Sequence, residues 1–265
     1  MNNTDRMAVY LGNNRAITRT IWGHKIFVDT RDLALTPHIL LDGFWEAWIT
    51  KVFVTRLRTG MTVVEVGSNF GYYSLLAAAN VGSSGKVYCF EANPAVAEML
   101  TDTLTINGFL DRCKVDNKAV YSKSGQLQFG CQPRFVAGSS LGYAGAGGSV
   151  TTIEVEGISL DEYLSDGTRV DLLKIDAEGS ELEIIRGARR VLTQNPDINL
   201  IIEYSPRLLS KVSGSGAAEV LADELASMGF RAFRITTEST LEPRTRDQLL
   251  SLVHDELLIT RHDSP

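Results

Sequence analysis

Apolar residues in this chain recur in two patterns that alternate along most of its length. Short runs rich in valine, isoleucine and leucine predict buried strands, and longer stretches with apolar residues three or four positions apart predict helices. Strands are expected at 62–66, 86–90, 113–116, 170–176 and 198–203, and helices at 71–81, 94–107, 178–193 and 215–228. This alternation predicts an α/β fold with a doubly wound, mostly parallel sheet that carries helices on both faces.

The region before the first of these strands shows different patterns. Residues 15–30 alternate between apolar and polar side chains on either side of Gly23, which predicts a β-hairpin. Residues 44–58 place bulky apolar groups at helical spacing. We therefore expect residues 1–60 to form an N-terminal extension and residues 61–265 to form the main domain.

The last two apolar runs and one glycine-rich stretch complete the pattern. Residues 231–235 and 256–260 lack a helical crossover between them, so we expect an antiparallel hairpin that closes one edge of the sheet. Residues 130–150 contain six glycines, and we expect no regular element there. Two interpretations stay open for this stretch: a disordered excursion between the strands of a hairpin, or a lid over a binding site.

Composition and charge narrow the class of protein. The 265 residues are 44% hydrophobic, enough for a substantial core, and the formal net charge is −6. An acidic chain with a pI near 5.3 lacks the positive field typical of nucleic-acid-binding proteins. The sequence shows neither a signal peptide nor an apolar run long enough for a transmembrane segment. The three cysteines have no zinc or CxxC spacing, so we expect reduced thiols and a cytoplasmic protein.

The most informative segment is the turn that follows the strand 62–66. Glu65 lies at the end of the apolar run, Gly67 and Gly71 follow, and a helix rich in alanine and leucine begins at once. Such a turn brings backbone N–H groups and a helix N-terminus up to a bound small molecule. Glu91 follows the next strand, 20 residues past Gly71, where a βαβ unit places the carboxylate that binds ribose hydroxyls. The two features predict an adenosine-containing cofactor.

The residues of the turn discriminate among such cofactors. A nicotinamide dinucleotide requires the pattern GxGxxG, and Ser68-Asn69-Phe70 supplies no middle glycine. The GK[ST] ending of a phosphate-binding P-loop is also absent. Glu65 would repel a pyrophosphate, whereas it would stabilise a ligand that carries an amino group and a sulfonium. S-adenosylmethionine meets these requirements, and a nicotinamide-dependent oxidoreductase or a non-catalytic cofactor-binding module is less favoured.

A second cluster of ionisable residues surrounds the end of the strand 170–176. Lys174 and Asp176 share one face of that strand, with Glu178 just beyond it, and Glu203 ends the next strand. Because adjacent parallel strands end at the same sheet edge, we expect Lys174, Asp176 and Glu203 to converge on a catalytic site. An acidic site suits a sulfonium, a divalent metal or a hydroxyl that loses its proton, and we leave the metal open. The alternative is a salt-bridge network that caps the following helix.

With these segments in view, the chain resembles the FkbM-like family of S-adenosylmethionine-dependent methyltransferases. Glu65 and Ser68 depart from the family's usual Asp and Ala, and both are compatible with cofactor binding. The resemblance covers residues from about 45 to 260 and rests on three segments, of which the last in the chain is by far the most specific. The three segments are the turn at 64–71, then Phe90-Glu91-Ala92-Asn93-Pro94, then Leu173-Lys174-Ile175-Asp176-Ala177-Glu178-Gly179-Ser180-Glu181.

The resemblance implies a class I methyltransferase fold, which is Rossmann-like, with a mixed seven-stranded sheet that contains one antiparallel strand. It implies O-methylation of a small-molecule or glycan hydroxyl, on a saccharide, a glycolipid or a sugar-bearing secondary metabolite. A peptide or a non-sugar natural product is the alternative acceptor. We expect residues 1–60 and 130–150 to determine the acceptor, and we predict no oligomeric state.

The resemblance also assigns individual residues. Gly67, Asn69 and Gly71 are expected along the methionine and ribose portions of the cofactor, Glu91 at the ribose hydroxyls and Asn117 near the adenine. The ends of the two strands at 176 and 203 are where some catechol-type methyltransferases hold a metal, which is a likeness of fold only. The expected catalytic residues are Asp176, Lys174 and Glu203. The expected cofactor-binding residues are Glu65, Gly67, Ser68, Asn69, Phe70, Gly71, Glu91, Ala92, Asn93, Asn117 and Asp176.

Overall fold

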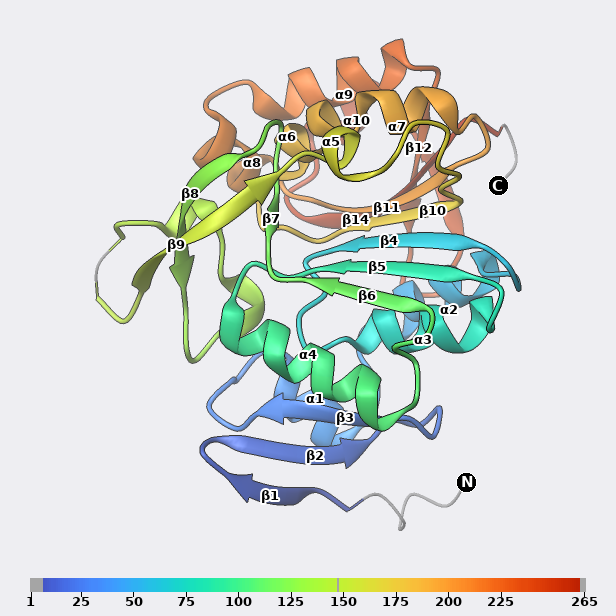
Figure 1. Ribbon diagram of the computed structural model, residues 1–265. Coiled ribbons are helices and arrows are strands. Elements are labelled where there is room, and N and C mark those ends of the chain that lie inside the picture. Colours follow the sequence, from blue (N-terminus) through green and yellow to red (C-terminus); the bar gives the residue numbers. More distant parts are fainter. Residues whose placement is uncertain (1–6, 147, 263–265) are drawn as a thin grey trace.

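An eight-stranded sheet runs through the middle of the molecule (Figure 1), which we describe from a computed structural model over residues 7–146 and 148–262. Its strand order is β13-β12-β14-β11-β10-β4-β5-β6. The five strands expected at its centre are all present and pair in parallel. The strands are β4 (Thr62–Val66), β5 (Lys86–Phe90), β6 (Cys113–Asp116), β10 (Leu172–Ile175), β11 (Asn199–Tyr204), β12 (Arg231–Ile235), β13 (Leu241–Arg244) and β14 (Asp255–Thr260).

Helices cover both faces of this sheet, as the alternation of patterns predicts (Figure 1). On one face α3 (Tyr72–Val81) and α4 (Pro94–Ile106) share a core with the N-terminal elements. On the other face lie α6 (Glu181–Gly187), α7 (Arg189–Gln194) and α9 (Ala217–Ser227). Three further helices are α5 (Leu160–Tyr163), α8 (Pro206–Ser213) and α10 (Arg246–Leu250). Within the described residues, no helix has the length and apolar character needed to cross a bilayer.

The helix expected at 178–193 is two helices, α6 and α7, and it begins later than predicted. Its first residues form the turn after β10, in which Glu178 has a positive φ of 51°. The break lies at Ala188, directly after Gly187, the last residue of α6. A Cβ on Gly187 would approach the Tyr121 carbonyl oxygen to 2.1 Å, so only a glycine allows the end of α6 to pack this closely on that backbone.

The C-terminal pair is antiparallel as predicted, but it does not close the sheet edge. β14 lies between β11 and β12, and the edge strand is β13, which we did not predict. Both β13 and β14 run antiparallel to their neighbours, so the expected seven strands are extended by one. β14 is buried along almost its whole length, which suits a central position, whereas β13 is polar and contains Pro243.

The N-terminal residues form a separate three-stranded sheet that packs on α4. The expected hairpin is present as β2 (Arg15–Arg19) and β3 (Lys25–Asp29), and β1 (Val9–Gly12) adds an exposed third strand. The helix expected at 44–58 is α2 (Ala47–Arg56), and the short helix α1 (Leu35–Leu41) precedes it. The Thr103 hydroxyl in α4 accepts a hydrogen bond from the Phe27 N–H at 3.1 Å, which ties this sheet to the main core.

The glycine-rich segment 130–150 joins the two strands of an antiparallel pair, the connection that one of the two interpretations predicts. These strands are β8 (Gly125–Cys131) and β9 (Thr151–Ile158), and β7 (Ala119–Val120) pairs with β9. The expectation of no regular element is wrong, because two 3-10 helices form, η2 (Val136–Gly138) and η3 (Leu141–Tyr143). Paired backbone hydrogen bonds between Gly130 and Ser140 fold the segment back on β8.

Candidate functional site

A cavity of about 220 Å³ lies at the carboxyl ends of β4, β5, β10 and β11. This is the sheet edge at which ligands bind in open α/β folds. Leu35, Trp45 and Glu46 line it from the N-terminal elements, and Val136 and Leu141 line it from the segment 130–150. The two regions expected to determine the acceptor therefore both reach the cavity.

The turn after β4 is shaped by backbone contacts. Gly67 has a φ of 79° and lies against the Asp176 backbone, so that a Cβ at this position would be 1.8 Å from the Asp176 carbonyl oxygen. The Gly67 and Ser68 N–H groups both donate to the Phe90 carbonyl at 3.0 Å. Asn69 has a left-handed φ of 49°, which Asn tolerates better than most residues. The turn is thus held between β5 and β10, with its remaining groups facing the cavity.

Glu65 is buried at the end of β4 and still lines the cavity. The Ser74 hydroxyl of α3 donates a short hydrogen bond to its carboxylate. Burial raises the pKa of Glu65 to about 7, against the opposing effects of the Ser74 hydrogen bond and of nearby Lys174. A cation bound in the cavity would therefore favour the charged form of this residue.

Glu91 holds the turn together from the end of β5. Its carboxylate accepts hydrogen bonds from the Asn69 N–H at 2.9 Å and from the Asn93 N–H at 2.8 Å. Burial nevertheless raises the pKa of Glu91 to about 7. The Asn117 side chain donates to the Glu91 and Ala92 carbonyls at 2.8 and 3.0 Å, so it supports the loop that carries Glu91.

Lys174 is buried behind the cavity, with 1% of its surface exposed. Its ammonium lies 2.9 Å from Asp176 Oδ2 and 4.5 Å from the centre of the Tyr73 ring. Burial alone would lower the pKa of Lys174, but the surrounding carboxylates outweigh it and raise the pKa above its usual value. These carboxylates belong to Asp176, Glu256, Glu46 and Glu65. Lys174 is therefore a permanent charge that orients Asp176 toward the cavity.

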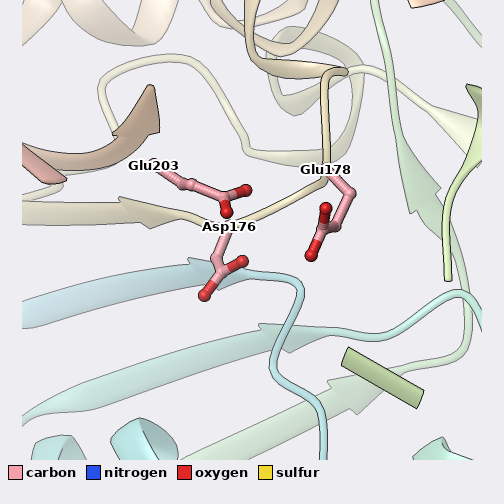
Figure 2. A group of neighbouring side chains, drawn as sticks. All are labelled: Asp176, Glu178 and Glu203. Carbon is pink, nitrogen blue, oxygen red and sulfur yellow. The ribbon is translucent and has the colours of Figure 1, made fainter. Parts of the chain in front are cut away.

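Three acids converge at the ends of β10 and β11 (Figure 2). One carboxylate oxygen each from Asp176, Glu178 and Glu203 lies within 4.8 Å of the other two. Burial, and then the charge of Asp176, raise the pKa of Glu178 to about 8. The same two causes hold the pKa of Glu203 well above its usual value. The strand ends expected to meet do meet, and Glu178 joins them.

Two further acids of the cavity were not predicted from the sequence. Glu46 precedes α2 with a left-handed φ of 41°, and the Tyr73 hydroxyl donates to it at 3.2 Å. Burial is the main cause that raises the pKa of Glu46 to about 7. Glu256 lies directly opposite Glu203 in the β11–β14 register. The sequence could have indicated Glu256 only if β14 had been predicted to lie beside β11, because the pairing of these strands puts Glu256 next to Glu203.

The residues expected to bind a cofactor or act in catalysis fall into two groups. Those that line the cavity are Glu65, Gly67, Ser68, Asn69, Glu91, Ala92, Asp176 and Glu203. The others support the lining without being part of it: Phe70, Gly71, Asn93, Asn117 and Lys174. Phe70 is fully buried in the core, and Asn93 caps the N-terminus of α4 through its side chain.

The cavity is lined by many more acidic than basic side chains. Seven acids line it, against Lys118 and His254, and Lys118 is already paired with Glu156. Raised pKa values at several of these acids indicate that the cavity by itself stabilises neutral carboxyls. An arrangement of this kind suits a cationic ligand. The seven acids are Glu46, Glu65, Glu91, Asp176, Glu178, Glu203 and Glu256.

Comparison with known proteins identifies relatives over the same region. The family described as "Methyltransferase FkbM domain" matches residues 65–232. The chain is 28% identical over 163 residues to "Methyltransferase sdnD" of Sordaria araneosa, covering 51% of this chain and 62% of the relative. It is 27% identical over 163 residues to "Hexuronic acid methyltransferase AglP" of Haloferax volcanii, covering 59% and 61%. The alignments thus span about three fifths of the length of each of these relatives.

A solved structure confirms the fold. The TYW2 protein of Pyrococcus horikoshii, in complex with MeSAdo, superposes with a TM-score of 0.50 and 11% identity. The match covers 96% of this chain and 74% of that one. Together with the strand order, the likeness establishes the expected Rossmann-like class I methyltransferase fold, with β13 as an addition at the edge.

Proposed function

This chain belongs to the methyltransferase FkbM domain family, and on that premise we propose that it methylates a hydroxyl oxygen with S-adenosylmethionine. The observation that carries the proposal is the acid-lined cavity beside the glycine turn of β4. Among adenosine cofactors, S-adenosylmethionine is the one that brings positive charge at both its sulfonium and its amino group. Seven carboxylates would repel a dinucleotide pyrophosphate and stabilise this cation.

The proposed cofactor site uses the lining of the turn. We assign the methionine and ribose portions to the backbone of Gly67, Ser68 and Asn69, next to Glu65. We assign the ribose hydroxyls to Glu91, each of whose oxygens already accepts one backbone hydrogen bond and retains a free lone pair. The adenine would then lie toward Ala92, Ala119 and Phe129, which provide apolar surface at the far end of the cavity.

The proposed reaction is an in-line displacement. The acceptor oxygen forms a bond to the methyl carbon as the carbon–sulfur bond breaks, and the electron pair of that bond stays on sulfur. The acceptor proton passes to a carboxylate that lines the cavity, with Asp176, Glu203 and Glu46 as the candidates. Lys174 lies outside the lining, so we assign it the role of a positioning residue that holds Asp176. Alignment of the two substrates would supply most of the acceleration.

We propose a saccharide, a glycolipid or a sugar-bearing metabolite as the acceptor. The similarity to a hexuronic acid methyltransferase supports a sugar as the acceptor. The acceptor side of the cavity is lined by Trp45, Tyr72 and Tyr73, and aromatic rings of this kind pack against the apolar faces of sugars. The segment 130–150 would act as a lid, since Val136 and Leu141 already line the cavity. A peptide or a non-sugar natural product is the second candidate class.

Titration calorimetry tests the cofactor. We expect S-adenosylmethionine to bind more tightly than S-adenosylhomocysteine, whose sulfur is neutral, and NADH to show no binding. Asp176→Asn should abolish methyl transfer while the protein stays folded. Tight binding of NADH instead would favour the oxidoreductase alternative, and unchanged turnover in Asp176→Asn would favour a non-catalytic module.

Labelled methyl transfer tests the acceptor. Glycan, glycolipid and peptide pools are incubated with the protein and methyl-labelled S-adenosylmethionine, and the products are analysed by mass spectrometry. We expect the label on a hydroxyl oxygen of a sugar. Label that appears only in the peptide pool, or on nitrogen, would contradict the proposed acceptor.

A further inference from the structure

We propose that Asp176, Glu178 and Glu203 form a binding site for a hard divalent cation of the Mg²⁺ or Mn²⁺ type. Figure 2 shows the three carboxylates gathered around a common space, from the end of β10, the turn after it and β11. All three side chains line the cavity, so an ion between them is accessible from solvent. None of them is a histidine or cysteine, and oxygen-only ligand sets favour Mg²⁺, Mn²⁺ and Ca²⁺ over zinc or copper.

The separation of the oxygens fits an ion without movement of the backbone. One oxygen from each carboxylate lies within 4.8 Å of the other two. Around Mg²⁺, with bonds of about 2.1 Å, adjacent ligand atoms lie about 3 Å apart and opposite ones about 4.2 Å apart. Around Ca²⁺, with bonds of about 2.4 Å, the corresponding separations are about 3.4 and 4.8 Å. At most one pair of three ligands can be opposite, so side-chain rotations that bring the oxygens closer together would complete the coordination.

An unsatisfied buried oxygen provides the second, independent observation. Glu203 is 7% exposed, and its Oε2 is buried without a hydrogen-bond partner. Its other oxygen lies 3.6 Å from His254 Nε2, so that side of the carboxylate faces an imidazole ring. A buried carboxylate oxygen without a donor is costly, and a cation bound beside it removes that cost.

The protein supplies too little positive charge for the cluster. Lys174 pairs with Asp176, and Arg207 acts on Glu178 from beyond ion-pair distance, but no lysine or arginine in residues 7–146 and 148–262 forms an ion pair with Glu178 or Glu203. Glu256, directly opposite Glu203 on β14, adds a further carboxylate with an unpartnered Oε2. When all three acids are ionised their like charges repel, and a cation between them removes that repulsion.

An ion held by three protein ligands keeps other coordination positions open toward the cavity. In the proposed methyl transfer, such a position would take the acceptor oxygen and make its proton easier to remove. That role rests on the proposed function, whereas cation binding itself does not. The two are therefore tested separately.

The test is a titration with Mn²⁺ in the absence of cofactor and acceptor. Purified protein is treated with a chelator, dialysed and titrated, and free Mn²⁺ is followed by its paramagnetic resonance signal. We expect one Mn²⁺ per chain with a Kd below about 1 mM, displaced by excess Mg²⁺. Glu203→Gln and Glu178→Gln keep side-chain volume and should weaken binding by about 10-fold or more. The matched control is Glu154→Gln, an exposed acid on β9, which should bind as the unmodified protein does.

Two results would overturn the proposal: no Mn²⁺ binding by the unmodified protein, or equal binding by Glu203→Gln and the control. Thermal unfolding of each variant establishes that it is folded. If Mn²⁺ binds at these residues while methyl transfer is absent, the proposed function fails and the cation site stands. If methyl transfer proceeds unchanged after chelator treatment and no Mn²⁺ binds, the cation site fails and the function stands.

Discussion

Gly67 and Asp176 meet through their backbones, so closely that a Cβ on Gly67 would lie 1.8 Å from the Asp176 carbonyl oxygen. The Asp176 N–H also donates to the Val66 carbonyl at 3.0 Å. The turn after β4 and the end of β10 are therefore one rigid unit, although the sequence separates them widely. The contact couples the proposed cofactor site to the acid cluster that would assist the chemistry.

The first prediction concerns this contact. Gly67→Ala should lower the free energy of unfolding by about 3 kcal/mol or more, since a left-handed backbone and a backbone clash both oppose the methyl group. Chemical denaturation measures the loss. Gly108→Ala is the control, because Gly108 has a φ of 71° and a methyl group added there would have no atom within 4 Å, so it should lose only about 1 kcal/mol. Equal losses in the two variants would contradict the close contact.

The central sheet was predictable from the sequence because its signals are local. The strand at 62–66 is recognisable as an apolar run, and the helix after Gly71 by its own apolar residues. The glycine turn and the cluster of ionisable residues lie at the ends of such elements. β13 was missed because an exposed edge strand needs no apolar alternation. The break at Ala188 follows directly on the close contact of Gly187 with the backbone of Tyr121, a long-range contact that no local pattern reveals.

The difference between local patterns and long-range contacts also explains which site residues were predicted. Asp176 and Glu203 follow apolar strands, so their place at the sheet edge follows from parallel pairing. Glu46 reaches the cavity through a turn before α2, and Glu256 through the insertion of β14 beside β11. Both positions depend on tertiary arrangement, which is set by packing of the whole chain.

The second prediction concerns the buried charge of Lys174. Lys174→Met leaves Asp176 and its acidic neighbours without their counter-ion, and should cost roughly 3–5 kcal/mol of unfolding free energy at neutral pH. Part of the loss should be regained as the pH falls and the carboxyls take up protons. Lys114→Met is a matched control: Lys114 and Asp116 also lie two residues apart on a strand, but at 3.7 Å with a side chain that is 59% exposed. We expect it to cost less than about 1 kcal/mol, and a comparable loss would contradict the prediction.

The third prediction is a pH dependence of stability. Burial raises the pKa of both Glu65 and Glu91 to about 7 from an ordinary value of 4.5. The folded protein therefore binds more protons than the unfolded chain between these values, and its stability should fall as the pH rises from about 4.5 to about 7. His24 acts in the opposite direction, because burial lowers its pKa and its protonation favours the unfolded chain.

Thermal unfolding of the ligand-free protein across this range measures the effect. We expect the midpoint temperature to be higher near pH 5.5 than near pH 8, and Glu65→Gln to flatten the dependence. His24→Gln is the control and should make the fall with rising pH steeper. A midpoint that rises steadily from pH 5.5 to pH 8 would show that other groups outweigh these carboxyls.

The fourth prediction concerns Glu46 and depends on the proposed methyl transfer. Glu46→Gln keeps an oxygen for the Tyr73 hydroxyl, which donates to it at 3.2 Å, but removes the charge. If Glu46 accepts the proton, turnover should fall by roughly 100-fold or more with little change in cofactor affinity. Stability at pH 8 should not decrease, since a buried carboxylate whose pKa is raised to about 7 is lost. Glu154→Gln is the control, and equal turnover in both variants would assign the proton to another residue.

The fifth prediction concerns Asp32, which joins the N-terminal elements to the segment 130–150. Its buried carboxylate accepts hydrogen bonds from the Leu35 N–H at 2.9 Å, the Thr36 N–H at 2.8 Å and the Val136 N–H at 3.0 Å. Asp32→Ala leaves these donors without a partner, at roughly 1–3 kcal/mol for each that stays buried. The cheapest relief is for the segment to detach at Val136, because α1 keeps its own helical hydrogen bonds.

Limited trypsin digestion measures this detachment, since Arg134 lies in the same segment and its carbonyl accepts from the Leu33 N–H at 2.8 Å. We expect cleavage after Arg134 to be several-fold faster in Asp32→Ala, and binding of S-adenosylmethionine to slow it again if the segment closes over the cavity. Asp197→Ala is the control, because that side chain is 89% exposed. Unchanged cleavage in Asp32→Ala would mean that the segment is held by its packing on the cavity, so that Asp32 would serve α1 alone.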